Sequence, residues 1–205
     1  MFNFKFFIAI CALSLFTGAA ARAATCDTVD VSVTPLSYVV RDNLSAREML
    51  EQLLDGGAHN ITASSMALGM VVAKQENSIS VTEAPDGCRV FHVKVGFAPA
   101  TMYLANELVD FKCGYRHVRS HEMEHVRIYS DFLAQVAGSL PQTLTAIAST
   151  GTRDDNAADI AHMYKALGVE FSKVYEQQHA LDSDETYKRN AEVCKGGLVA
   201  IALAF

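Results

Sequence analysis

The sequence is short of positive charge, and its apolar leader is too short to cross a bilayer. Its 17 Lys and Arg residues face 23 Asp and Glu residues, which gives a net charge of −6 at pH 7. Nucleic acids and anionic membrane surfaces attract proteins with an excess of basic side chains, so neither is an expected partner. The apolar run at residues 6–16 is shorter than the roughly 20 residues of a transmembrane helix, so stable membrane insertion is not expected either.

The sequence also lacks internal repeats, low-complexity segments and recognisable linkers. Hydrophobic residues make up 50% of the chain and no long polar tract interrupts them, so we expect a packed core rather than disorder. The length then favours a single domain over residues 24–205.

Residues 1–23 have the features of a secretory signal peptide. Lys5 supplies a basic start, an apolar run follows, and Ala21-Arg22-Ala23 is a small-x-small cleavage site. We expect cleavage after Ala23, with Ala20 and Ala24 as alternatives. The protein is therefore predicted to be exported, to the periplasm or the extracellular space, and the leader looks bacterial.

No Cys-x-x-Cys pair is present, which argues against a cysteine metal site or a redox motif of that type. Beyond the leader the chain contains Cys26, Cys88, Cys113 and Cys194. An even count in an exported protein indicates two disulfides, and four cysteines allow three pairings. We favour Cys26–Cys88 with Cys113–Cys194.

Strands are predicted in the first half of the chain and helices in the second, which indicates an α+β fold. The sheet is expected to be small, antiparallel or mixed, and accompanied by one helix that starts at the capping box Ser45–Glu48 and ends at Gly56-Gly57. Two long helices should follow. The predicted strands are 29–34 with 38–40, 67–75, 78–83, 88–97 and 101–104, and the predicted helices are 114–137, 154–181 and 184–194. The apolar tail 198–205 should pack on the core or form an edge strand.

Residues 121–125 read His-Glu-Met-Glu-His and carry the clearest chemical signal. Positions four apart lie on one face of a helix, so His121 and His125 can share one metal ion. Glu122 then lies beside that ion, where it can accept a proton from a water molecule. The pattern predicts a Zn²⁺ site in which Glu122 is the catalytic base.

A catalytic zinc site needs a third protein ligand, which we expect from residues 179–187. Asp182 or Glu185 is favoured, with only one of them acting as ligand, and His179, Glu170 and Glu176 are the less favoured alternatives. Two nearer residues are set aside. If the helix is straight, Asp131 points away from His125, and His117 cannot reach the same tetrahedral centre. The acidic segment 182–185 also fits the start of a helix, because Asp182 or Ser183 followed by Glu185 is a capping pattern, and this is the competing structural interpretation.

These features together resemble the uncharacterised secreted bacterial proteins predicted to be zinc-dependent proteases. The shared features are the leader, a strand at Gly87-Cys88, the His-Glu-x-x-His helix and a later Leu-Asp-x-x-Glu segment. The resemblance spans most of residues 24–205, and the metal motif is its specific part. Such proteins tend to have Tyr-Asp-x-x-Thr-x-His-Gly near the end, where residues 181–188 keep Asp182 and lack the histidine. The resemblance implies a zincin-like metallopeptidase domain.

Likeness to zinc peptidases implies two further roles. An edge strand ahead of the metal helix commonly binds the substrate backbone, and residues 101–104 are where that strand should fall. Tyr187 is a candidate to stabilise the oxyanion.

The leading hypothesis is a zinc metalloprotease that hydrolyses a peptide or protein substrate. The alternatives are a non-catalytic metal-binding or cell-envelope interaction protein with a degenerate site, and a chance pattern on a solvated helix face.

Overall fold

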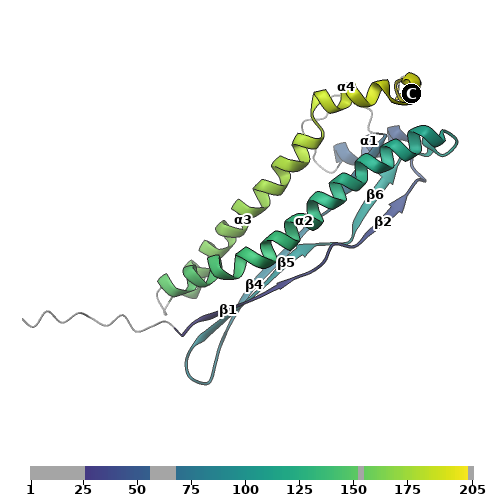
Figure 1. Cartoon of the computed structure of the whole chain (residues 1–205). Helices are drawn as coiled ribbons and strands as arrows, with labels where there is room; N and C mark the ends of the chain where they lie inside the picture. Colours follow the sequence, from purple (N-terminus) through teal and green to yellow (C-terminus); the bar gives the residue numbers. More distant parts are fainter. Residues whose placement is uncertain (1–25, 56–67, 152–154, 203–205) are drawn as a thin grey trace, which may run out of the picture.

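The computed structural model describes residues 26–55, 68–151 and 155–202 (Figure 1). The predicted signal peptide therefore lies outside the described residues, as does the predicted helix end at Gly56-Gly57. The elements in chain order are β1 (Thr28–Val33), β2 (Tyr38–Arg41), α1 (Ala46–Asp55), β3 (Gly69–Val72), β4 (Gln75–Glu83), β5 (Arg89–Phe97), β6 (Ala100–Leu104), η1 (Asn106–Leu108), α2 (Lys112–Thr150), α3 (Asn156–Leu181), α4 (Asp184–Glu192), η2 (Val193–Gly196) and α5 (Gly197–Ala202). The fold is α+β, with mixed sheets and long helices, as predicted.

The strands form two short mixed sheets that continue one another. Their orders are β1-β5-β4 and β2-β6-β3, and in each sheet the central strand runs parallel to the first neighbour and antiparallel to the second. Hydrogen bonds bridge the break between them, from Thr34 N to Val95 O at 2.9 Å and from Ala98 N to Lys74 O at 2.8 Å. Pro35 and Pro99 lie at the break, where a missing N–H is tolerated.

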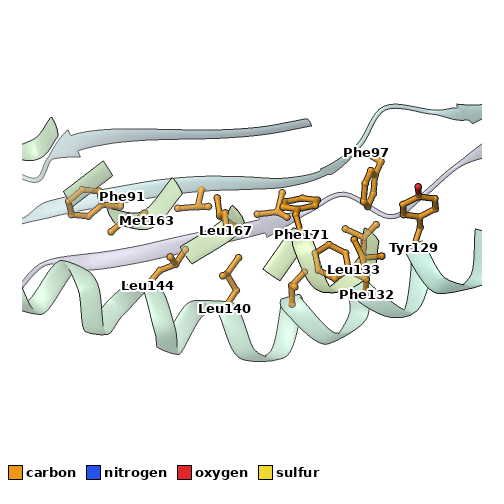
Figure 2. Close-up of a cluster of buried hydrophobic side chains, with 14 of the residues drawn as sticks. Phe91, Phe97, Tyr129, Phe132, Leu133, Leu140, Leu144, Met163, Leu167 and Phe171 are labelled. Atoms are coloured by element: carbon orange, nitrogen blue, oxygen red, sulfur yellow. The ribbon is translucent and has the colours of Figure 1, made fainter. Parts of the chain in front are cut away.

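One face of the first sheet is buried by α2 and α3. Every second residue of β1 and β4 turns toward the helices, and β5 is the most deeply buried of the three strands. Figure 2 shows the apolar side chains that fill the space between the sheet and the two helices. The buried residues of this cluster are Phe91, Val93, Val95, Phe97, Tyr129, Phe132, Leu133, Val136, Leu140, Leu144, Ala148, Met163, Leu167, Phe171 and Val174.

Two predictions about elements near the proposed metal site were wrong. The second helix was expected to stop near Gly138 and Pro141, but α2 continues to Thr150. Leu144 and Ala148 extend its buried stripe beyond Pro141, and this burial outweighs the hydrogen bond that proline removes. The strand at 101–104 was expected at an edge, but β6 is the central strand of its sheet, between β2 and β3.

Several local predictions are confirmed. The capping box of α1 is formed, because Ser45 N donates to Glu48 Oε2 at 2.7 Å and Glu48 N donates to Ser45 Oγ at 3.2 Å. Residues 198–202 of the apolar tail belong to α5, whose Leu198 is buried, so this part of the tail packs on the core and is not an edge strand. No helix in the described part of the chain combines the length and the hydrophobicity of a membrane span.

Both disulfides have the favoured pairing. Cys26 is bonded to Cys88 with a Cα–Cα distance of 5.4 Å, and Cys113 is bonded to Cys194 with a Cα–Cα distance of 5.9 Å. The first fixes the chain ahead of β1 to the start of β5. The second fixes the first turn of α2 to the C-terminal segment.

A buried ion-pair cluster lies beside the first disulfide. Arg89, 6% exposed, donates from Nη2 to Asp27 Oδ2 at 2.7 Å, and its Nη1 lies 2.8 Å from Asp159 Oδ2. The pairs join β5 to the chain before β1 and to the first turn of α3. Removing one member of such a cluster leaves the others charged and buried.

We therefore expect Arg89→Met to lower the free energy of unfolding by about 3–5 kcal/mol, measured by urea denaturation. The control is Arg47→Met, which removes an exposed pair with Glu51 at 3.3 Å. This control should change the free energy by less than about 1 kcal/mol. Equal, small effects of the two substitutions would contradict a stabilising role for the buried cluster.

Candidate metal centre

Helix α2 presents His121 and His125 on one face, one turn apart. The helix is unbroken through this segment, and the two imidazole rings lie with their centroids 5.0 Å apart and nearly perpendicular. His125 is buried and His121 is half-buried. A solvated helix face does not describe this segment, because Glu122 between them is only 4% exposed.

The end of α3 brings Asp182 to both histidines. Asp182 is the C-cap residue of α3, and its Oδ1 lies 3.1 Å from Nε2 of His121 and 3.1 Å from Nε2 of His125. The potential ligand atoms of these three residues all lie within 4.8 Å of one another. The other favoured candidate, Glu185, is exposed on α4 and is not part of this group.

Gln178 fixes the orientation of the His125 ring. Its Oε1 is hydrogen-bonded to Nδ1 of His125, and its Nε2 donates to the backbone oxygen of His125 at 3.1 Å. Because the amide nitrogen is committed to that carbonyl, Nδ1 of His125 must be the protonated nitrogen. In the neutral form of the ring the lone pair of Nε2 then faces Asp182, and in the protonated form Nε2 donates a hydrogen bond to Asp182. Gln178 was not predicted, although it lies one helical turn before Asp182 and is therefore on the same face of α3.

The charges of the site favour a cation between the histidines and Asp182. Burial alone raises the pKa of Asp182, but hydrogen bonds from the two histidines, and then their charges, outweigh it and hold the pKa well below its usual range. Burial likewise lowers the pKa of His125, and its hydrogen bonds to Asp182 and Gln178 outweigh that effect, so the pKa is raised. A proton on a histidine and a metal ion would each supply the positive charge that the carboxylate of Asp182 attracts at this point.

Glu122 lies between α2 and strand β3. A Cβ on Gly69 would lie 2.6 Å from Glu122 Oε1 and 2.5 Å from Val118 Cγ1, so only glycine leaves room for the carboxylate at this point of the strand. Burial raises the pKa of Glu122 to about 7, while the charges of His125 and His121 oppose the rise and Asp182 adds to it. Such a carboxyl group can accept or return a proton near neutral pH.

The remaining sequence candidates lie elsewhere. Asp131 is exposed, because α2 continues as a helix through it, and His117 is hydrogen-bonded through Nε2 to Asn190 Oδ1 at 3.0 Å. The side chain of Tyr187 lies outside the described residues. The less favoured ligands also lie outside the group: His179 and Glu176 are exposed, and Glu170 pairs with Lys173 at 2.7 Å.

Comparison with known proteins gives no family to which this site can be assigned. No protein-family model, curated protein or solved structure matches the chain. The resemblance to secreted zinc-dependent proteases therefore stays a prediction.

The burial of Glu122 gives the metal-free protein a specific pH dependence. The unfolded chain releases the Glu122 proton near pH 4.5, whereas the folded protein keeps it to about pH 7. The stabilising contribution of the protonated form is therefore complete below about pH 4.5 and is lost as the pH rises to about 7. Relative to Glu122→Gln, the free energy of unfolding of the wild type should fall by up to about 3 kcal/mol across that range.

Urea denaturation at several pH values, in the presence of a chelator, measures this difference. Glu124→Gln is the control, because Glu124 is on the same turn but is paired with Arg127 at 2.6 Å near the surface. It should keep the pH dependence of the wild type. Parallel curves for the wild type and Glu122→Gln would show that Glu122 ionises as readily in the folded protein as in the unfolded chain.

Proposed function

We propose that this protein is an exported zinc-dependent peptidase whose metal is held by His121, His125 and Asp182. One observation carries the proposal: two imidazole nitrogens from α2 converge on a single carboxylate oxygen from α3, each at 3.1 Å. When His125 is neutral, the lone pair on its Nε2 faces the carboxylate of Asp182. The two groups then repel one another unless a cation lies between them.

The donor set fits zinc in type and in spacing. Zinc binds imidazole nitrogen and carboxylate oxygen at about 2.0–2.2 Å in a tetrahedral arrangement, which separates neighbouring ligand atoms by about 3.3 Å. The two distances of 3.1 Å to Asp182 Oδ1 are close to that spacing. Three protein ligands leave one position open, as in catalytic zinc sites. Two histidines and one carboxylate also suit iron, and the adjacent Glu122 favours zinc because a buried base serves hydrolysis.

The chain supplies the proton transfer for peptide hydrolysis. A zinc ion in such a site lowers the pKa of water and polarises a carbonyl group. Glu122 accepts a proton from the attacking water and returns it to the nitrogen of the leaving amine. Gln178 keeps Nε2 of His125 free for the metal by holding the proton on Nδ1.

Strand β3 is the candidate for binding the substrate backbone. It is an outer strand in the order β2-β6-β3, and its first residue, Gly69, lies against Glu122. An extended peptide that pairs with an outer strand forms main-chain hydrogen bonds largely independent of its side chains. A peptide held along β3 would bring its carbonyl groups close to Glu122. Export is supported by the two disulfides, which form and persist in oxidising compartments.

The first test of this function is metal content. The purified protein should bind about one zinc per chain, measured by elemental analysis and by competition with a chromophoric chelator. Asp182→Asn should weaken binding by more than about 100-fold, since loss of an outer-shell partner alone costs 10–100-fold. Asp131→Asn makes the same chemical change on an exposed face of α2 and should bind zinc like the wild type. Equal affinities of the two variants would remove Asp182 from the site.

The second test separates catalysis from metal binding. Glu122→Gln should keep its zinc and lose about 100-fold or more of the cleavage rate of a denatured, fluorescently labelled protein, because it lacks the base. Glu124→Gln should cleave at the wild-type rate. Zinc binding without cleavage in the wild type would instead support a non-catalytic metal-binding protein. Undiminished cleavage by zinc-loaded Glu122→Gln would contradict the mechanism.

A further inference from the structure

The N-terminal part of α2 is tied to the C-terminal part of the chain at four successive turns of one face, from Cys113 to His125. Four residues spaced four apart along α2 each have a partner there, and the partners follow in the reverse order. The pairs are Cys113 with Cys194, His117 with Asn190, His121 with Asp182, and His125 with Gln178 and Asp182. The proposed metal site is thus one half of a longer line of contacts, and the other half ends in a disulfide.

Asp182 lies at the joint between α3 and α4. Its backbone leaves the helical conformation, with φ −89° and ψ 28°, and its N–H donates to the carbonyl of Gln178 at 3.3 Å. Its side chain is 38% exposed. The arm beyond the joint consists of α4 (Figure 1) and η2, and it is bound to α2 through Asn190 of α4 and Cys194 of η2. The position of Asp182 therefore depends on how the arm is held as well as on α3.

The far end of the arm is held in a strained conformation. Cys194 and Lys195 both lie in the left-handed region, with φ 58° and φ 57°, and Gly196 follows at φ 77°. Such conformations cost free energy in residues other than glycine and persist only where surrounding contacts impose them. Here the contacts are the disulfide to Cys113 and the packing of Leu198 against Gly114, where a Cβ would lie 2.9 Å from Leu198 Cδ2.

We propose that the segment from α4 to α5 is a redox-sensitive clamp that holds Asp182 over the metal helix and is locked by Cys113–Cys194. The inference rests on the proposed zinc site. A dithiol reductant would supply two electrons and two protons, break the S–S bond into two cysteine thiols and itself close to a disulfide. The strained turn is then free to relax, the arm loses its fixed end, and Asp182 is held less firmly against His121 and His125. Reduction therefore weakens metal binding.

Zinc affinity of two matched serine variants tests the clamp, with competition against a chromophoric chelator as the measurement. Cys113→Ser combined with Cys194→Ser removes the lock without adding thiols that bind zinc. Cys26→Ser combined with Cys88→Ser removes the other disulfide, which joins the chain before β1 to β5. The first variant should bind zinc about 10-fold or more weakly, the range seen when groups that orient ligands are lost. The second should stay within about 3-fold of the wild type.

Hydrogen exchange of the oxidised and phosphine-reduced wild type provides a second measurement if the first variant fails to fold. Reduction should speed the exchange of the α4 amides and leave those at the middle of α2 protected. Unchanged protection of α4, or equal zinc affinities of the two serine variants, would overturn the clamp alone. A wild-type protein that binds no zinc would overturn the proposed function and the clamp with it.

Discussion

The antiparallel packing of α3 along α2 brings the candidate metal ligands of the two helices together. Helix α2 has 39 residues and α3 has 26, and a short connection joins them, so they form one long hairpin over the sheet (Figure 1). Phe132, Leu140 and Leu144 of α2 fill the same core as Met163, Leu167 and Phe171 of α3 (Figure 2). This burial brings Asp182 to within hydrogen-bonding distance of residues about 60 positions earlier in the chain. His121 and His125 both lie on α2, whereas the third candidate ligand, Asp182, meets them only because the two helices pack as a hairpin.

This difference between the residues of α2 and the more distant Asp182 explains how much of the site could be predicted from the sequence. The helical spacing of His121 and His125, with Glu122 beside them, is a property of one continuous segment. The choice of Asp182 over Glu185 depends on where α3 ends, since Asp182 is the C-cap residue of α3 whereas Glu185 already belongs to the next helix, α4. Gln178 and Gly69 carry no signal of their own, because each acquires its role only when a distant element packs against it.

The errors about the fold have the same origin. Pro141 and Gly138 are local signals for a helix end, and they were outweighed by the burial of Leu144 and Ala148, which depends on tertiary contacts. The strand at 101–104 was predicted correctly as an element, yet its place between β2 and β3 is a matter of topology. The strands and the capping box of α1, in contrast, follow from local sequence patterns. The cysteine pairing was one choice among three that the sequence leaves open, and the structure contains that pairing.

Polar groups at both ends of the hairpin give its apolar core a fixed register. Apolar ridges and grooves repeat with each helical turn, so a hydrophobic interface alone discriminates weakly between registers one turn apart. At one end Arg89 binds Asp159 in the first turn of α3, and at the other Gln178 binds His125 through both of its polar groups. A slip of one turn would leave buried charges and amides without partners, at a cost far above that of repacking apolar side chains. The groups that position the proposed metal ligands therefore also select the fold in which those ligands meet.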